Sequence, residues 1–244
     1  MTEVSGRAAP WRLLVFGVTG AIGAAAAEAA MERGWTVVGA SRAGRRDGTS
    51  EGHDIIRYDP FAEDGAGAPE WGDAFDAVCW AQGANAADSV RDVTEASHLE
   101  LYRANCVFVL LSLRDLLAAG KLSASGARLC VVSSIWQDRA RQNKLSYTMT
   151  KAAIGGMVRS ASVDLAADGH LINAVLPGVI DTPMTRQNLS AEQLDRVQSA
   201  TPFGRLASLA SVAEAIGFFC SSANTGVTGQ SVTVDMGFSN AHLL

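Results

Sequence analysis

The chain has 244 residues, 48% of them hydrophobic, and a formal net charge of −5. This length and composition allow one domain with a large buried core. The acidic balance argues against a general nucleic-acid binder and against a protein that binds anionic membranes, because both partners require an excess of Lys and Arg. No stretch approaches 18 uninterrupted apolar residues, so the sequence predicts no membrane span.

Apolar strands and helices alternate along the chain. The predicted strands lie at residues 11–16, 35–40, 55–58, 77–81, 127–133, 171–176 and 232–235, and the predicted helices at residues 21–33, 99–119, 146–167 and 211–221. The strands carry apolar residues at consecutive positions, which is typical of a parallel sheet that is covered on both faces. Right-handed crossovers then predict an α/β fold, a doubly wound parallel sheet of about seven strands in a single Rossmann domain over residues 1–244.

The remaining segments are read as connections. Residues 1–10 lack the apolar region of a signal peptide, so we expect a flexible N-terminus and a cytoplasmic protein. Residues 44–52 and 62–72 are predicted as polar, glycine-rich surface loops, and residues 181–202 as an inserted loop or helix on the substrate side. The four cysteines lie far apart without a Cys-x-x-Cys pair, so we expect buried free thiols and no metal site: Cys79, Cys106, Cys130 and Cys220.

A glycine-rich turn, with Gly17, Gly20 and Gly23, connects the first predicted strand to the first predicted helix. In a doubly wound sheet this turn places backbone N–H groups and a helix N-terminus against a pyrophosphate. Glycine permits the tight turn and the close approach that a Cβ would obstruct. The turn therefore predicts a dinucleotide site, with these expected contacts: Gly17, Thr19, Gly20, Ala21, Ile22 and Gly23.

The end of the second predicted strand bears on the choice of cofactor. A carboxylate at this position would bind both ribose hydroxyls and favour NAD, but the chain has Ser41 and Arg42 there, followed by Arg45 and Arg46. A guanidinium pairs with phosphate in bidentate fashion, so NADP(H) is favoured over NAD; the alternative is that these arginines form a solvated loop. Asp59, at the end of the third strand, is a candidate contact for the adenine amino group.

Tyr147 and Lys151 stand four residues apart, one helical turn, so the phenol and the ammonium share a face. A cation beside a phenol favours the phenolate, and we therefore expect Lys151 to lower the pKa of Tyr147 towards the range of a general acid or base. A serine upstream, Ser133 or Ser134, could hold a carbonyl or alcohol oxygen while the tyrosine transfers the proton. Alone, such a pair is more often a surface helix contact.

Together with the glycine turn, these residues resemble the short-chain dehydrogenase/reductase family, of the classical type, over essentially the whole chain. Ser134 lies thirteen residues before Tyr147, the usual catalytic spacing, and Ser133 corresponds to its structural neighbour. The resemblance implies that Asn105 anchors a water-linked proton relay to Lys151. It also implies that a segment after the sixth strand wraps the nicotinamide, with these contacts: Pro177, Gly178, Ile180 and Thr182.

Two departures from the family pattern predict a local repacking at the cofactor loop. The Thr-Gly opening of the glycine motif is Phe16-Gly17 here, and the Asn-Asn-Ala-Gly segment after the fourth strand is Trp80-Ala81-Gln82-Gly83. The resemblance implies that these two segments contact and support one another in the family, so the loss of both family sequences in this chain predicts a joint rearrangement. Ala81, Gln82 and Gly83 remain the expected cofactor contacts. The spacing of the glycines is similar to that of extended-type sugar epimerases and dehydratases, but the chain leaves no room for a sugar-nucleotide domain.

The resulting hypothesis is an NADP(H)-dependent oxidoreductase that acts on a carbonyl/alcohol pair. Ser134, Trp136, Tyr147 and Met184 are the expected substrate contacts, and Arg139, Arg141 or Lys144 could meet a carboxylate, a phosphate or a carrier protein, or simply form a solvated loop. A non-catalytic NADP-binding protein on the same fold is the alternative. Apolar excess on the helices at residues 99–119 and 146–167 predicts a homo-oligomer, a tetramer with two-fold axes.

Overall fold

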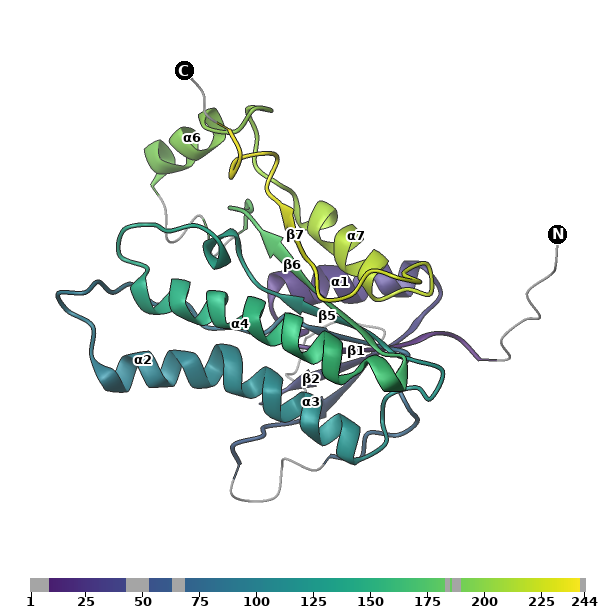
Figure 1. The fold of residues 1–244 in the computed structure, drawn as a ribbon. Coiled ribbons are helices and arrows are strands. Elements are labelled where there is room, and N and C mark those ends of the chain that lie inside the picture. Colours follow the sequence, from purple (N-terminus) through teal and green to yellow (C-terminus); the bar gives the residue numbers. More distant parts are fainter. Residues whose placement is uncertain (1–8, 43–52, 63–68, 183–184, 186–189, 242–244) are drawn as a thin grey trace.

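The computed structural model describes residues 9–42, 53–62, 69–182, 185 and 190–241. Seven strands form one sheet in which every neighbouring pair is parallel, in the order β3-β2-β1-β4-β5-β6-β7 (Figure 1). The strands are β1 (Arg12–Phe16), β2 (Thr36–Ser41), β3 (Asp54–Arg57), β4 (Ala77–Trp80), β5 (Arg128–Val132), β6 (Leu171–Pro177) and β7 (Ser231–Val234). The predicted doubly wound sheet is confirmed. The strand order reverses between β1 and β4, where ligands bind in such sheets.

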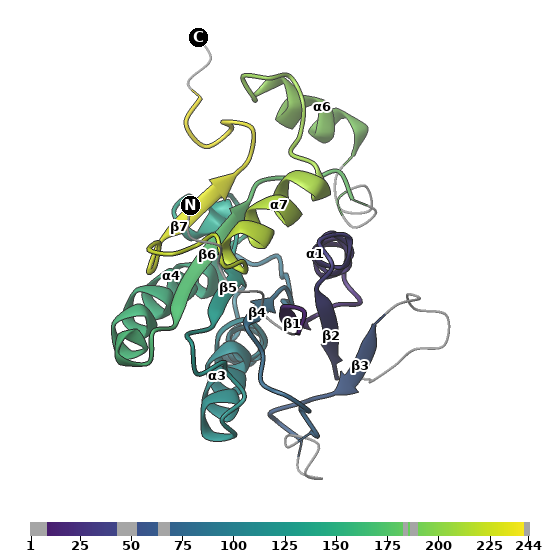
Figure 2. The ribbon, with the colours of Figure 1, turned by 90° about the vertical axis from the view of Figure 1, so that its right-hand side faces the viewer.

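Helices cover both faces of the sheet (Figures 1 and 2): α2, α3 and α4 lie on one face, and α1 and α7 on the other. The helices are α1 (Ala21–Glu32), α2 (Glu95–Tyr102), α3 (Phe108–Ala118), α4 (Leu145–Asp164), α6 (Ala191–Ser199) and α7 (Leu209–Phe219). The helix α6 stands beyond the strand ends. No helix in the described ranges is both long and apolar enough to cross a membrane.

Side chains alternate between two hydrophobic cores, one on each face of the sheet. Phe16 and Trp80 belong to the core beneath α3 and α4, where their rings stack at 5.7 Å with an interplanar angle of 14°. Val15 and Cys79, their neighbours along the same strands, point into the core beneath α1 and α7. All four cysteines are buried free thiols, as predicted. In the described part of the chain, no group of three or more possible ligands could hold a metal ion.

Two predictions at the level of elements need correction. The single helix expected at residues 99–119 is three segments, because a π-helical turn, Arg103–Val107, separates α2 from α3. Residues 62–72 were expected to form a surface loop, yet Trp71 is buried, because its indole packs against Phe16 and Tyr58. Residues 181–202, predicted as an inserted loop or helix, contain the helix α6, whose N-terminus is closed by a capping box between Ser190 and Gln193.

Candidate active site

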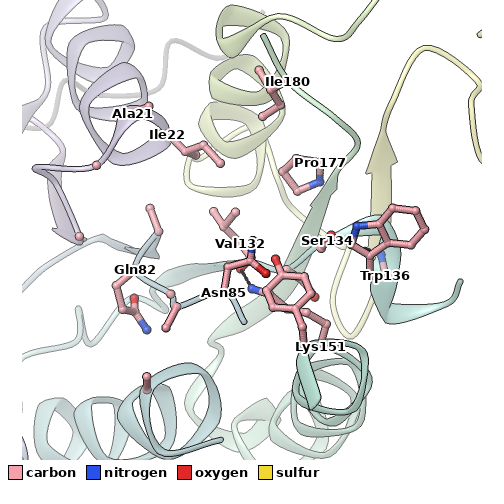
Figure 3. Close-up of a pocket in the computed structure, with 18 of the residues that line it drawn as sticks. Ala21, Ile22, Gln82, Asn85, Val132, Ser134, Trp136, Lys151, Pro177 and Ile180 are labelled. Carbon is pink, nitrogen blue, oxygen red and sulfur yellow. Dashed lines mark hydrogen bonds between the residues drawn. The ribbon is translucent and has the colours of Figure 1, made fainter. Parts of the chain in front are cut away.

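A cavity of about 820 Å³ opens at the carboxyl ends of the central strands. Its walls include the residue that follows each of four strands: Gly17 after β1, Ala81 after β4, Ser133 after β5 and Gly178 after β6. Figure 3 shows the two sides of the cavity: Ala21 and Gln82 lie on one side, and Ser134 and Trp136 on the other. This volume is large enough for a cofactor and a small substrate together.

The glycine turn forms one end of this cavity. Gly17 has a φ of +76°, and a Cβ there would lie 2.6–2.9 Å from atoms of Gln82. Gly23 is not among the residues that line the cavity. A Cβ on it would lie 2.2 Å from the carbonyl oxygen of Gly17, so this glycine allows α1 to pack against the turn. The N-cap of α1, Gly20, provides no side-chain hydrogen bond, and the first turn has no acidic residue. The free N–H groups of this turn therefore suit an anion.

Gln82 occupies an unusual position among the predicted cofactor contacts. Gln82 lines the cavity, and both polar atoms of its side-chain amide are buried without a hydrogen-bond partner. Because such an amide is costly to bury alone, it suits a polar ligand at this position. Most of the other predicted contacts also line the cavity: Gly17, Thr19, Gly20, Ala21, Ile22, Ser41, Arg42, Ala81, Gly83, Tyr147, Lys151, Pro177, Gly178, Ile180 and Thr182.

Three predicted residues do not line the cavity, and a fourth is outside the described residues. Gly23 and Asn105 lie behind the lining, and the Asp59 carboxylate accepts a hydrogen bond from the Phe61 N–H at 3.0 Å. The adenine contact of Asp59 therefore remains only a prediction. Met184 is outside the described residues, as are Arg45 and Arg46.

Ser134, Tyr147 and Lys151 all line the cavity. Figure 3 shows Ser134 and Lys151 on the side away from Ala21, the first residue of α1. Tyr147 and Lys151 belong to α4, and Ser134 follows β5 and caps a short 3-10 turn, Ile135–Gln137. The Lys151 ammonium lies 5.5 Å from the centre of the Tyr147 ring and donates a hydrogen bond to the Val132 carbonyl at 3.2 Å. The serine, tyrosine and lysine predicted from spacing therefore meet in space.

The expected pKa relationship between Tyr147 and Lys151 needs correction. Burial raises the pKa of Tyr147 above its ordinary value, and only a hydrogen bond with Ser134 opposes this effect. Burial also lowers the pKa of Lys151 to about 8, an effect that the nearby Cys106 weakly opposes. Desolvation therefore sets the direction of both pKa shifts, because both groups are removed from water, and Lys151 is not among the causes of the Tyr147 shift.

Asn105 braces the structure around this triad. Its side-chain amide donates to the Ala84 carbonyl and to Thr150 Oγ1, each at 3.0 Å, and accepts from the Ala84 N–H at 2.7 Å. Asn105 therefore ties the π-helical turn to the loop after β4 and to α4. Gly83 lies between this residue and the lysine, since a Cβ on it would be 3.2 Å from Asn105 Oδ1 and 3.8 Å from Lys151 Nζ.

The N-terminus of α4 is held by the loop that follows β4. The Asp88 carboxylate accepts from the Ser146 N–H at 2.9 Å, and its carbonyl accepts from the Leu145 N–H at 3.2 Å. The Lys144 ammonium donates to Asn85 Oδ1 at 2.8 Å and to the Ala86 carbonyl at 2.9 Å. Asn85 lines the cavity, and sequence analysis missed it because the loop carries no motif. Other residues missed as lining are Ala40, Phe61, Ala84, Ala87, Ala104, Phe108, Val132, Gln142, Asn143, Val179 and Thr185.

The chain is similar in sequence to several known proteins. A family model described as enoyl-(acyl carrier protein) reductase matches residues 66–239. The uncharacterized oxidoreductase YmfI of Bacillus subtilis is 30% identical over 187 residues, which cover 76% of each chain. The cis-4-hydroxycyclohexanecarboxylate dehydrogenase of Sinomonas cyclohexanicum is 41% identical over 118 residues, about half of either protein: 48% of this chain and 47% of that one.

Similarity also extends to solved structures. The structure of ElxO with NADP bound superimposes with a TM-score of 0.81 at 21% identity, covering 94% of this chain and 99% of that chain. At this identity the likeness shows the fold alone. The family model and the Bacillus relative, which span most of the chain, establish more than the fold. With a serine, a tyrosine and a lysine gathered in a cavity beside a glycine turn, the chain belongs to the short-chain dehydrogenase/reductase family.

Proposed function

We propose that this protein is an NADP(H)-dependent oxidoreductase that interconverts a carbonyl and an alcohol on a small molecule. The observation that carries the proposal is that Ser134, Tyr147 and Lys151 line the same cavity as the glycine turn. The Sinomonas relative, by its name, oxidises an alcohol, which supports the same reaction class.

The residues of the cavity fit a dinucleotide with a 2′-phosphate. The first turn of α1 offers free N–H groups to the pyrophosphate, Gln82 offers an unpaired amide, and Lys151 can reach the nicotinamide ribose. Arg42 lines the cavity, and it has no hydrogen-bond or ion-pair partner among the described residues, so its guanidinium is available to a phosphate. When bound, NADPH supplies the hydride.

The proton is handled by the protein's own side chains. Ser134, which lines the same cavity as Tyr147, would hold the carbonyl oxygen of the substrate. Tyr147 would donate its phenolic proton to that oxygen. Because burial keeps the pKa of Tyr147 high, the phenol is protonated at neutral pH and suits the reducing direction. Lys151 would stabilise the phenolate that forms, and Asn105 would hold the loop and helix that position the lysine.

Steady-state assays test the proposal. Purified protein is incubated with NADPH or NADH and a panel of ketones, β-keto thioesters and keto acids, and the absorbance of the reduced cofactor is followed. We expect oxidation of NADPH that depends on a carbonyl substrate and that is lost in Tyr147→Phe. NADPH binding without turnover of any carbonyl or alcohol would instead support the non-catalytic alternative.

A further inference from the structure

The charged residues around the cavity are all cations. Arg42, Arg141, Lys144 and Lys151 line it, and no Asp or Glu is among the described residues of the lining. The whole chain carries a net charge of −5, so this local excess of positive charge runs against the overall balance. A cavity lined by one sign of charge concentrates ligands of the opposite sign.

The proposed function uses only two of these four cations. Arg42 lies at the glycine-turn end of the cavity, where the 2′-phosphate of the cofactor would lie, and Lys151 serves the tyrosine. Arg141 and Lys144 are the remaining pair. Lys144 lies 5.7 Å from the centre of the Tyr147 ring, which places this pair beside the reacting end of the cavity.

The structure holds the two remaining cations close together despite their repulsion. Partial burial of the ammonium lowers the pKa of Lys144, electrostatic repulsion from Arg141 lowers it further, and Asp88 opposes both effects. Lys144 is fixed by its hydrogen bonds to Asn85 and Ala86, which leave it one free N–H. Asn143, between them, has a φ of +58°, a conformation that non-glycine residues adopt at a cost.

Arg141 is free to bind a ligand. It is exposed, it lines the cavity, and it has no hydrogen-bond or ion-pair partner in the described part of the chain. Arg139, two residues earlier, differs in both respects: its guanidinium bonds to Asn240 Oδ1 at 3.5 Å, and it does not line the cavity. A planar guanidinium with unused donors binds an oxyanion in bidentate fashion.

We infer that Arg141, assisted by the free N–H of Lys144, forms an anion subsite, and that the substrate is a carbonyl or alcohol compound that carries a carboxylate or phosphate group. This inference rests on the proposed function for the reaction at Tyr147. The anionic group would lie at the mouth of the cavity near Trp136, and the reacting oxygen at Ser134 and Tyr147. The subsite would fix which carbonyl of a substrate faces the hydride.

Binding of unreactive analogues tests the subsite without any need for turnover. Calorimetry in the presence of NADP compares cyclohexanecarboxylate with its uncharged isostere, cyclohexanecarboxamide, on wild-type protein, Arg141→Met and the matched control Arg139→Met. We expect the carboxylate to bind about tenfold more tightly than the amide to wild type and to Arg139→Met, as one charge-assisted pair predicts. The preference should vanish in Arg141→Met and weaken with added salt.

Steady-state kinetics distinguish a carboxylate from a phosphate as the anionic group of the substrate. The substrates are 4-oxocyclohexanecarboxylate, its methyl ester, and 4-oxocyclohexyl phosphate, each with NADPH. We expect one of the two anions to have a KM about tenfold below that of the ester, and Arg141→Met to remove that difference. The anion with the lower KM shows whether the natural substrate carries a carboxylate or a phosphate.

Several results would overturn the subsite. They are equal binding of the carboxylate and the amide by wild-type protein, binding of neither, or an anion preference that survives in Arg141→Met. Failure of the proposed function is distinguishable, because it appears as an absence of carbonyl reduction on every substrate while the binding preference persists.

Discussion

The ammonium of Lys151 donates a hydrogen bond to the carbonyl oxygen of Val132, over 3.2 Å. Val132 is the last residue of β5 and stands two positions before Ser134, and Lys151 stands one helical turn after Tyr147. This single contact therefore ties the strand that carries the serine to the helix that carries the tyrosine. The lysine that makes this contact is buried away from solvent, which has consequences for stability.

Replacing Lys151 with Met should stabilise the protein in the absence of cofactor, and by an amount that depends on pH. The pKa of Lys151 is about 8 in the folded protein and 10.5 in the unfolded chain. Between these values the unfolded chain binds more protons, so the stability of the wild type rises with pH relative to the variant. The cost of burying the charge, about 3 kcal/mol, is complete below about pH 8 and falls as the pH rises towards about 10.5.

Urea unfolding near pH 7 and near pH 10 measures this effect. The stability advantage of Lys151→Met should narrow at the higher pH. Lys121→Met, which removes an ammonium that bonds to the Gly72 carbonyl at the surface, is the control. An advantage that is the same at both pH values would show that the lysine charge is not penalised by burial.

Tyr147→Phe should lower turnover by about 10² or more, because general acid catalysis contributes on that order. NADPH affinity and the unfolding midpoint should change little, because the ring remains. Tyr102→Phe, which removes the hydroxyl of a tyrosine on α2 that is 39% exposed, is the matched control. Near-normal turnover of Tyr147→Phe would refute the proposed mechanism.

Arg42→Met should weaken NADPH binding about tenfold or more, since a charge-assisted contact to phosphate is worth about 1.5–3 kcal/mol. NADH binding should change little. The double variant Ser41→Asp with Arg42→Ile should move the preference further towards NADH, because the new carboxylate accepts from the ribose and repels the 2′-phosphate. Fluorescence titration of both cofactors measures the ratio, and a wild-type protein that already prefers NADH would contradict the assignment.

Gly23→Ala should destabilise the protein and weaken cofactor binding together. The new Cβ would lie 2.2 Å from the Gly17 carbonyl oxygen, so α1 must move away from the turn. Such overpacking typically costs about 1–3 kcal/mol. Gly226→Ala is the control, because a Cβ at Gly226 meets nothing within 4 Å. Thermal unfolding with and without NADPH measures both effects; a normal cofactor-induced shift in Gly23→Ala would rule out the tight packing of α1 on the turn.

The protein is expected to be a homo-oligomer, and the exposed apolar side chains on α2, α3 and α4 are its candidate contacts. These side chains are Leu99, Leu110, Met149 and Val163, with exposed fractions of 55%, 54%, 49% and 74%. Sedimentation should give a multiple of the 25.5 kDa chain mass. Leu110→Glu should shift the distribution towards smaller species, whereas Val90→Glu, a change at a loop residue that is 78% exposed, should not. A wild-type monomer at micromolar concentration would refute the expectation.

The sequence by itself determined the elements and the order in which they follow one another. Consecutive apolar residues in β1, β5 and β6 predict buried parallel strands, because a strand covered on both faces needs apolar side chains at every position. The one-turn spacing of Tyr147 and Lys151 places both on one face of α4, because helix geometry is local. The glycine turn and Arg42 could likewise be assigned to the cofactor site, because each directly follows or ends a predicted strand.

Only the tertiary structure decided the electrostatics and the lining of the cavity. Lys151 was expected to lower the pKa of Tyr147, but burial raises it, and burial depends on how α4 packs against β6 and against the turn at residues 135–137. Lys144 contacts Asn85, which is 59 positions away in the sequence. The loop that contains Asn85 carries no motif, so nothing in the sequence indicated this contact. Trp71 is buried because it packs against Phe16 and Tyr58, which are distant in sequence. Local patterns predict local geometry, whereas desolvation and long-range contacts arise only when the chain is packed.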